Sequence, residues 1–514
     1  MSVIVNIAMT VFSLLIAAAA FGYFRHRGDT VAEAGAYGLM AMLMLSSWTA
    51  QILLLLGLQR FLPVAMLMLT VPALRMVILR GKLLREQLRI ASNFVRLHPL
   101  PVTVFVCGGA CLFAFTVWNE IARETMTFKD IYPALARLDG SFFTLLQASP
   151  ATAATGLNHV IFLADWQPMA APPLANSCAY LVIALGTYAL ARRYAWPPTA
   201  ITATLLIVSM PRLVHQNLAA QSELLPAAAA LLAILALFRM VERPHREDGI
   251  MLLAAACFSV TDGRLCYLMP TVLLALSLLV LARRHNLRLW FQSLSGHWGY
   301  IAVGLSAVLI FGQVIGISYN LLHGLPWMGA LPGKEVAFNA GGIVGAAANM
   351  ARYLLQSIHL PDVMDTAAHR IFGWGLVDAL DLVYRQAVAT WSGARGTAEA
   401  YRLTWAPDNP WTWFGPVGFL LVIPAMGHAL WWGPHRLKTT ALAMLVYWML
   451  VALIVAWRPD NVRLLTPMFV CSGFFTAFFL PPWRIGRTGC RVLQWFSLAM
   501  TVYALLTYPG HSVL

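Results

Sequence analysis

Long uninterrupted runs of apolar residues, separated by short polar segments, dominate the chain. The runs are continuously apolar and do not alternate residue by residue, so they predict membrane-spanning helices and not barrel strands. A hydrocarbon core of about 30 Å requires roughly 20 apolar residues per helix, and about fourteen runs reach or approach that length. They lie near residues 3–23, 32–57, 61–80, 101–118, 176–191, 197–211, 222–240, 249–261, 265–282, 298–319, 412–433, 439–457, 464–481 and 492–508. The pattern predicts an all-α polytopic membrane protein.

The spacing of the runs divides the chain into four parts. These are three leading helices with an amphipathic cytoplasmic helix (1–98), a transmembrane core containing a first outer loop at 119–175 (99–320), an extracytoplasmic cap (321–411) and C-terminal helices (412–514). Some runs are short or interrupted, by Pro211 in one place and by "TDGR" (261–264) in another. Short or broken helices beside polar residues predict irregular backbone that lines a cavity within the protein.

The cap, 321–411, differs from the rest in its many charged residues. Helical periodicity at 349–360 and 375–391 predicts helices of its own on the outer face. The segment is interpreted either as a lid or acceptor platform or as a structural cap.

Composition supports the membrane class, and the distribution of charge gives an orientation. Of the 514 residues, 60% are hydrophobic and 11% are charged, whereas soluble domains are roughly half apolar and a quarter charged. The net charge of +14 comes from basic residues at every second inter-helix segment, which is the positive-inside pattern. It predicts that both termini, the first outer loop and the cap lie outside. The basic charge then reports topology and membrane lipids, and nucleic acid is not an expected partner.

The cysteines and the first residues exclude several other features. The seven cysteines form no CxxC or Cys/His spacing, so neither a disulfide framework nor a structural zinc site is expected.

The first apolar run follows Met1 without a basic start or a small-residue cleavage site, which predicts a retained helix and not a signal peptide.

Acidic residues gather where the run at 101–118 ends. The segment "WNEIARETMTFKDIYPALARLDGS" (118–141) contains Glu120, Glu124, Asp130 and Asp139. A single acid at a membrane surface is ordinarily only solvated, but four together followed by an amphipathic stretch predict a juxtamembrane helix that holds acids at the mouth of a cavity.

A second outer segment, 211–238, places His215, Gln216 and Glu223 at the start of a helix. Ionisable residues at a membrane boundary favour a functional site. The macrodipole of the helix offers another explanation for Glu223, because it favours an acid at a helix N-terminus. Both interpretations stay open.

Arginines at outer helix ends are candidate phosphate ligands. Arg458 and Arg463 run against the positive-inside trend, and Arg264 lies in the "TDGR" break. A guanidinium binds phosphate in a bidentate manner, while snorkelling to lipid headgroups is the alternative. Acids and arginines together suit a phosphate-bearing substrate and a nucleophile that must be deprotonated.

Two further patterns are weaker. Asp365 and His369 lie one helical turn apart and could hold a divalent metal, but this pair alone does not indicate a metal site, and no cofactor is predicted. The tryptophans of the outer loops are interpreted as an interfacial belt or as sugar-stacking platforms. They are Trp166, Trp327, Trp405, Trp411 and Trp413.

Five motifs, in order, resemble those of bacterial GT-C-type integral membrane glycosyltransferases, which use polyprenyl-phosphate-linked sugars. They are "ETMTFKDIYPALARLDGS" (124–141), "PRLVHQNLAAQSEL" (211–224), "SYNLLHGLPW" (318–327), "WFGPVGFLLVIP" (413–424) and "NVRLLTP" (461–467). Glu124 and Glu223 stand where this family has aspartate, and Phe128-Lys129 replaces its aromatic-histidine pair. The resemblance implies a GT-C-like core and leaves the first three helices as an addition.

The resemblance also implies roles for individual residues. Glu124 would be the general base that activates an acceptor hydroxyl, Glu223 would orient acceptor or base, and Glu120 is the alternative base. The remaining candidates for substrate binding are Lys129, Asp130, His215, Gln216, Arg264 and Arg463, the two arginines on the phosphate. A sugar would pass with inversion from its polyprenyl-phosphate carrier to a glycan, lipid or protein acceptor at the extracytoplasmic face of a bacterial plasma membrane.

Two other functions remain open at this stage. A transporter or flippase of a lipid-linked substrate would favour charged residues at mid-helix and two related halves, whereas the acids here cluster at the outer face. A non-catalytic assembly subunit on the same fold is the third interpretation, because both aspartate positions of the family hold glutamate.

Overall fold

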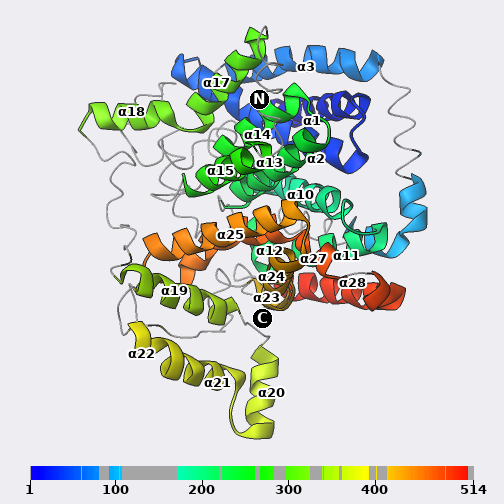
Figure 1. The fold of residues 1–514 in the computed structure, drawn as a ribbon. Coiled ribbons are helices and arrows are strands. Elements are labelled where there is room, and N and C mark those ends of the chain that lie inside the picture. Colours follow the sequence, from blue (N-terminus) through cyan, green and yellow to red (C-terminus); the bar gives the residue numbers. More distant parts are fainter. Residues whose placement is uncertain are drawn as a thin grey trace. The chain divides into compact units, whose positions relative to one another are not determined.

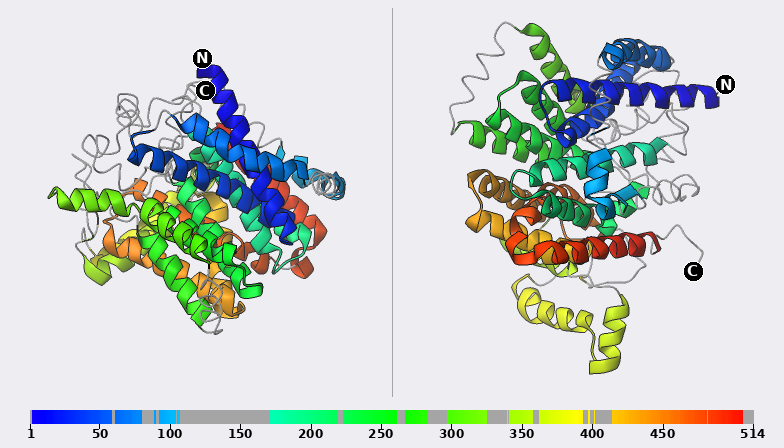
Figure 2. Two further views of the ribbon diagram at one scale, coloured as in Figure 1. Left: turned by 90° about the horizontal axis from the view of Figure 1, so that it is seen from above. Right: turned by 90° about the vertical axis from the view of Figure 1, so that its right-hand side faces the viewer.

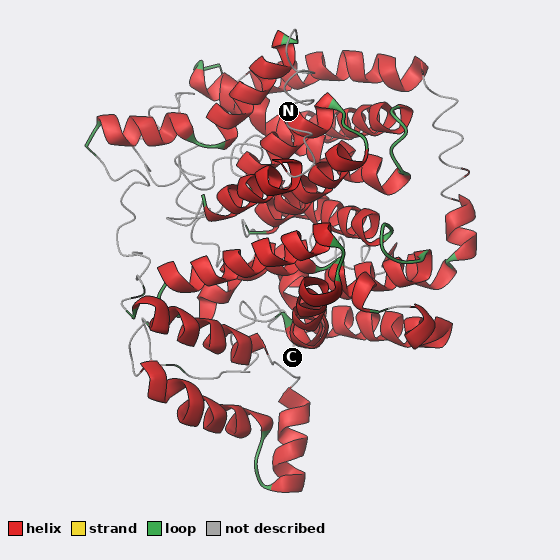
Figure 3. Cartoon of the chain, in the orientation of Figure 1, coloured by secondary structure: helices red, strands yellow, loops and turns green. Residues whose placement is uncertain are grey.

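The computed structural model is helical, and its described residues form two units. It describes residues 2–58, 61–79, 89, 92–103, 105–106, 171–218, 223–260, 267–282, 297–324, 339, 341–357, 362–392, 397, 401, 414–480 and 482–506. Within these ranges all named elements are helices (Figure 3). Unit 1 comprises Met1–Arg193 and Asn217–Pro332, and unit 2 comprises Tyr194–Gln216 and Gly333–Leu514. Each unit is described by itself.

The apolar helices make the chain a membrane-embedded protein. Four helical segments of the described residues are long and apolar enough to cross a membrane: Val31–Leu53, Leu224–Glu242, Gly415–Trp432 and His435–Ile454. Two bent helix pairs raise this number to at most six. The prediction of helices is confirmed, but the predicted count of about fourteen spans is not reached. Several predicted runs form shorter helices because proline, glycine or polar residues interrupt them, and residues 107–170 lie outside the described part.

Unit 1 is built around one helix that is apolar on all sides (Figure 1). Its elements are α1 (Ser2–His26), α2 (Val31–Leu55), α3 (Leu62–Leu79), α10 (Ala171–Ala191), α13 (Leu224–Glu242), α14 (Arg246–Phe258), α15 (Leu268–Ala282), α17 (Trp298–Phe311) and α18 (Val314–Leu322). Every residue of α13 except the last is buried, as expected of a helix without a polar face. It packs against α2, α10, α14 and α15.

Small residues let the helices of unit 1 approach closely. A Cβ atom added to Gly38 of α2 would lie 2.9 Å from the carbonyl oxygen of Ala17 in α1. A Cβ atom added to Gly186 of α10 would lie 3.1 Å from Leu231 of α13. Close backbone approach at such residues supplies packing contacts in a bilayer, where the hydrophobic effect does not hold helices together.

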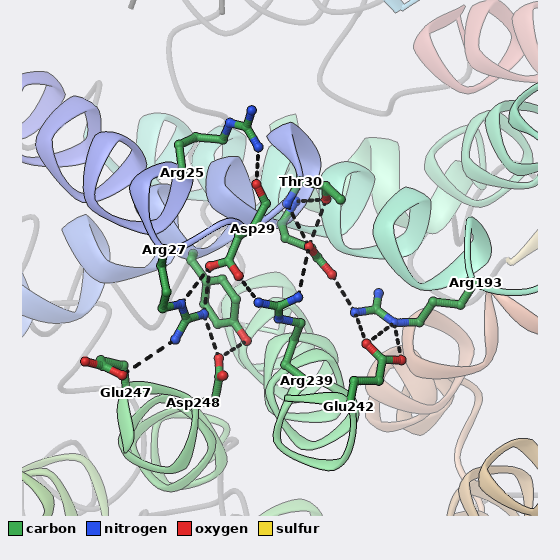
Figure 4. Close-up of polar contacts among 11 residues, drawn as sticks. Arg25, Arg27, Asp29, Thr30, Arg193, Arg239, Glu242, Glu247 and Asp248 are labelled. Carbon is green, nitrogen blue, oxygen red and sulfur yellow. Dashed lines mark hydrogen bonds and ion pairs between the residues drawn. The ribbon is translucent and has the colours of Figure 1, made fainter. Parts of the chain in front are cut away.

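Buried ion pairs join the helix ends on one side of unit 1 (Figure 4). Asp29, in the turn between α1 and α2, is fully buried and forms salt bridges with Arg27 (Nη2–Oδ2, 2.7 Å) and with Arg239 near the end of α13. Arg27 also pairs with Asp248 at the start of α14 (2.8 Å). The hydroxyl of Tyr37 donates to the same carboxylate at 3.0 Å.

A second set of pairs brings in the end of α10. Arg193 lies 2.5 Å from Glu33 of α2 and 3.0 Å from Glu242 of α13. Glu33 Oε2 also accepts hydrogen bonds from the backbone N–H and hydroxyl of Thr30, both at 2.9 Å, and so caps α2. Together with the pairs of Asp29, these contacts form a network across α1, α2, α10, α13 and α14, and we call it the ion-pair network.

The ion-pair network offsets burial unequally among its members. Burial raises the pKa of Asp248, because Arg27 and the Tyr37 hydroxyl only partly oppose it. Burial opposes the charge of Arg27, but Asp248 and Asp29 outweigh it and hold the pKa of the guanidinium above its ordinary value. Burial alone would raise the pKa of Glu247, yet its own backbone N–H, the Tyr23 hydroxyl and Arg27 lower that pKa below its usual range. Each buried charge is therefore matched by an opposite charge or a hydrogen-bond donor, as burial requires.

A second feature of unit 1 is the break between α17 and α18. The two helices meet at 52°, and Gln313 between them is left-handed (φ 55°), a conformation that is uncommon outside glycine. The hydroxyl of Tyr267 donates to the carbonyl of Gly312. This carbonyl follows the last residue of α17, where the helix break interrupts the helical hydrogen bonds. The predicted run at 298–319 is therefore a broken helix.

Unit 2 combines the candidate spans α23–α24 and α25 with the cap. Its described elements are α11 (Pro197–Val208), α19 (Gly342–Ser357), α20 (Asp362–Phe372), α21 (Leu376–Val383), the π-helix η3 (Tyr384–Val388), α22 (Ala389–Ser392), α23 (Gly415–Val417), the π-helix η5 (Gly418–Val422), α24 (Ile423–Trp432), α25 (His435–Ile454), the 3₁₀ helix η6 (Pro459–Leu465), α26 (Thr466–Ser472), α27 (Phe475–Phe479) and α28 (Pro482–Leu506). The helix α12 (Pro211–Leu218) follows α11.

The helices predicted for the cap are confirmed as α19 and as α21 with its continuation η3–α22. Buried polar side chains attach α19 to the end of α25. The Nδ2 atom of Asn349 donates to the carbonyls of Ala452 and Val455, both at 3.2 Å, and these lie where a helix end leaves carbonyls unsatisfied. Fully buried Arg352 donates to Asn349 Oδ1 (2.6 Å) and to the Tyr384 hydroxyl (3.2 Å).

We expect Arg239→Met to lower the stability of the purified protein in detergent by roughly 3–5 kcal/mol, because it leaves Asp29 and Glu33 buried with fewer partners. The measurement is thermal unfolding followed by circular dichroism. Arg243, the exposed next arginine along the chain, is the matched control, and Arg243→Met should change stability by less than about 0.5 kcal/mol.

Adding Asp29→Asn to Arg239→Met completes a double-mutant cycle. The double variant should lose less stability than the sum of the two single losses, because each single change strands the other partner. Strictly additive losses would show that the two side chains do not depend on each other.

Candidate functional site

The candidate site of unit 2 begins at a broken helix. Pro197–Val208 and Pro211–Asn217 are bent by 65° relative to each other. Proline lacks the N–H that would continue α11, and Pro211 instead opens α12 at its first position. The N–H groups of Leu213 and Val214 donate to the carbonyl of Met210 at 2.9 and 3.1 Å. The break that the prolines predict is thus confirmed, and its turn satisfies its own backbone.

The short helix α12 carries three polar side chains into the interior of unit 2. Arg212, His215 and Gln216 are all fully buried. With the amide of Gln216 turned so that its oxygen faces the surrounding donors, Oε1 accepts from Arg212 Nε (3.0 Å), Arg212 Nη2 (3.2 Å) and Thr466 Oγ1 (3.2 Å). This orientation gives these three donors an acceptor. His215 Nε2 lies 2.7 Å from the carbonyl of Ala504 in α28, to which it donates when protonated there.

The segment at 414–418 packs against this break. Gly415 is left-handed (φ 70°), and a Cβ atom added to it would lie 3.1 Å from Pro211 Cδ. The ring of Phe414 stacks on Phe469 of α26 with centroids 4.0 Å apart. A Cβ atom added to Gly418 would lie 3.1 Å from the same ring. Glycine is required at 415 by its conformation and fits at both positions because the neighbours are close.

The third segment is η6 with the start of α26. Arg458 and Arg463, both half-buried, lie at the beginning of η6 and inside it. The 3₁₀ turn is held by Tyr447, whose hydroxyl donates to the carbonyl of Leu464 (2.7 Å), and by Asn461, whose Nδ2 donates to the carbonyl of Ala456 (3.0 Å). Arg463 lies three residues before Thr466, the residue that bonds to Gln216.

The segments 211–216, 414–418 and 463–469 therefore meet in unit 2, although Gln216 and Thr466 are 250 residues apart along the chain. Between them they bring Arg212, an amide, a hydroxyl and an imidazole together in the interior, with Arg463 on the adjoining turn. A guanidinium is a group that recognises phosphate oxygens, and in this structure Nε and Nη2 of Arg212 donate to Gln216 Oε1. The three segments thus surround a hydrogen-bonded cluster of buried polar side chains.

The structure places the predicted site residues unequally. His215, Gln216 and Arg463 belong to the three segments just described. Glu223 lies in unit 1, buried at the N-cap position of α13, where the macrodipole favours an acid. The other predicted residues lie outside the described part of the chain, and their roles stay predictions: Glu120, Glu124, Lys129, Asp130 and Arg264.

Sequence reasoning missed Arg212. The sequence contains the feature that could have identified it, because Arg212, like Arg463, is a basic residue at a predicted outer helix end. Its hydrogen bonds to Gln216 are seen only in the structure.

Asp365 and His369, the pair considered for a divalent metal, join two helices of the cap. Asp365 Oδ1 accepts from the backbone N–H of Val377 (3.1 Å), and His369 Nε2 lies 3.0 Å from Asp378 Oδ2. The two side chains connect α20 to α21. Among the described residues, no three His, Cys, Asp or Glu side chains are grouped to hold a metal ion.

Comparison of the chain with protein-family models, curated proteins and solved structures finds no match. Fold and site together define an all-helical, multi-pass membrane protein with buried polar groups at a broken helix.

We expect Gly415→Ala to lower stability by about 1–2 kcal/mol through the left-handed backbone alone, with an added cost from the contact with Pro211. The measurement is the thermal midpoint in detergent. Gly427 is the matched control, because it lies inside α24 and an added Cβ meets nothing within 4 Å. Gly427→Ala should be neutral or stabilise by up to about 1 kcal/mol; equal effects of the two changes would contradict the packing described.

Proposed function

We propose that the chain is a membrane glycosyltransferase that transfers a sugar from a polyprenyl-phosphate donor to an acceptor hydroxyl, with inversion. The observation that carries the proposal is the meeting of segments 211–216, 414–418 and 463–469 in unit 2. These segments contain parts of three of the five motifs that resemble GT-C-type enzymes, at 211–224, 413–424 and 461–467. Motifs that are far apart in sequence and adjacent in the fold are what a shared site requires.

In this proposal the arginines and the carboxylates have different roles. Arg212 and Arg463 would bind the phosphate and stabilise the charge that develops on it as the carrier departs. Arg264 is a further candidate for this role. Glu124, with Glu120 as the alternative, would accept the proton of the acceptor hydroxyl, and Glu223 would orient acceptor or base.

The proposal also includes an architecture and a location. The chain would have a GT-C-like core, and both termini and the active site would lie on the extracytoplasmic side of a bacterial plasma membrane. The acceptor would be a glycan, a lipid or a protein. Membrane lipids are the other expected partners, and no metal or other cofactor is part of the proposed chemistry.

A transporter or flippase of a lipid-linked substrate is the second candidate, and the two bent helix pairs favour it. Their bends of 65° and 52° produce the discontinuous helices on which many transporters build substrate sites. A non-catalytic assembly subunit would share the same fold and would bind donor without releasing its carrier.

The proposed function is tested by the release of free polyprenyl phosphate from a panel of labelled polyprenyl-phosphate sugars, with the purified protein in lipid vesicles. We expect turnover with one donor, and a loss of roughly 10²–10⁴-fold in Glu124→Gln, the range for a missing general base. Arg212→Lys should also reduce turnover, because lysine lacks the planar fork that binds phosphate in a bidentate manner.

Arg385→Lys is the control for Arg212→Lys, since Arg385 is exposed on unit 2 and pairs with Asp381 within the same helical stretch. It should leave turnover unchanged. Movement of labelled donor across the vesicle membrane without release of polyprenyl phosphate would instead identify a transporter. Binding without release or movement would identify a non-catalytic subunit.

A further inference from the structure

The hairpin of α20 and α21 ends in an exposed apolar tip. Ile371 (72% exposed), Phe372 (67%) and Trp374 (57%) surround the turn between the helices. Of the two helices, α20 projects away from the other helices of unit 2 (Figures 1 and 2). Three large exposed apolar side chains within four residues are unusual for a water-facing surface. We call these three residues the apolar tip.

Specific contacts build the turn that presents the apolar tip. Gly373 adopts a left-handed conformation (φ 75°), which glycine adopts without strain. The N–H of Gly375 donates to Asp378 Oδ2 (2.9 Å), and the N–H of Val377 donates to Asp365 Oδ1 (3.1 Å). His369 pairs with Asp378. The hairpin is thus a defined structure, and its exposed side chains are held in place.

The opposite side of the hairpin is already covered. Leu376, Val377 and Leu380 of α21 pack against a core formed with residues of α19 and η3. This core leaves the apolar tip uncovered. The same structure that buries one side of α21 therefore directs the tip away from the unit's own core.

The position of the hairpin indicates what covers the tip. Its core rests on α19, and α19 packs along α25, one of the candidate spans. The hairpin is therefore one helix away from a membrane-crossing segment. Leu442 and Met449 of α25 are also exposed, so a bilayer around this span would meet apolar side chains of the same unit.

The chemistry of the tip agrees with this position. Tryptophan is enriched at the boundary between headgroups and acyl chains, and exposed Arg370 adjoins the tip with a long side chain that can reach the headgroups. Asp365 and Asp378 are engaged by backbone N–H groups and His369, and Asp381 by Arg385. These three acids are therefore occupied by neighbouring groups of the same unit.

We propose that the apolar tip inserts Ile371, Phe372 and Trp374 into the headgroup–acyl boundary of the bilayer, so that the α20–α21 hairpin is a membrane-surface anchor of the cap. Insertion rests on apolar contact, and the anchor operates whether the chain is an enzyme, a transporter or an assembly subunit.

The test attaches an environment-sensitive nitrobenzoxadiazole (NBD) fluorophore to the full chain at Phe372→Cys, in vesicles of phosphatidylcholine and phosphatidylglycerol. Thr366→Cys, at an exposed polar position on α20 of the same hairpin, is the matched control. The signal of the natural cysteines is measured on the labelled wild type and subtracted. Thermal unfolding of both variants checks that each is folded.

We expect the label at 372 to emit at shorter wavelength than the label at 366, to be quenched by doxyl-labelled lipid, and to be roughly threefold less accessible to iodide in the water, as for a group within the boundary region. Equal iodide quenching at the two positions would overturn the proposal. Shielding from iodide without quenching by labelled lipid would also overturn it, because a protein surface would then cover the tip.

Discussion

Asp29 is the residue on which the arrangement of unit 1 most depends. It is fully buried in the turn between α1 and α2 and binds Arg27 on one side and Arg239 on the other. A charge in such a place is tolerated only with opposite charges around it. If the turn separated from the end of α13, Asp29 or Arg239 would be left as a buried charge without its partner. From Arg239 the rigid helix α13 leads back to Glu223, roughly 24 Å away at 1.5 Å per residue. The ion-pair network and Glu223 thus lie near opposite ends of one span-length helix.

The positions of the helices were largely predictable, and their continuity was not. Each described apolar run forms helix where hydrophobicity predicts it, from α1 to α28. Proline explained the break before Pro211. The left-handed Gln313 and the π-helical turns of η5 depend on neighbours such as Tyr267 and Phe469, which a one-dimensional pattern does not contain. The predicted fourteen spans treated every apolar run as a straight crossing, whereas several runs form short or bent helices.

The candidate site was predictable only in part for a similar reason. His215, Gln216 and Arg463 attracted attention as polar residues at apolar helix ends. Arg212 has the same local pattern, but its importance comes from Gln216 and Thr466, and Thr466 lies 250 residues away. The ion-pair network was not predicted, because its basic residues, Arg27, Arg193 and Arg239, were interpreted as orientation signals and most of their acidic partners are far away in the sequence.

The ion-pair network has a consequence for how the chain is made. Positive residues orient a membrane protein while it is being inserted, and acidic residues contribute little to that choice. Arg193 and Arg239 meet Glu33 and Asp29 only once helices distant in sequence have packed. Before these helices pack, the two arginines lack those partners. In the finished protein the same side chains are largely withdrawn from water, so the packing of unit 1 turns solvated charges into contacts that hold the bundle together.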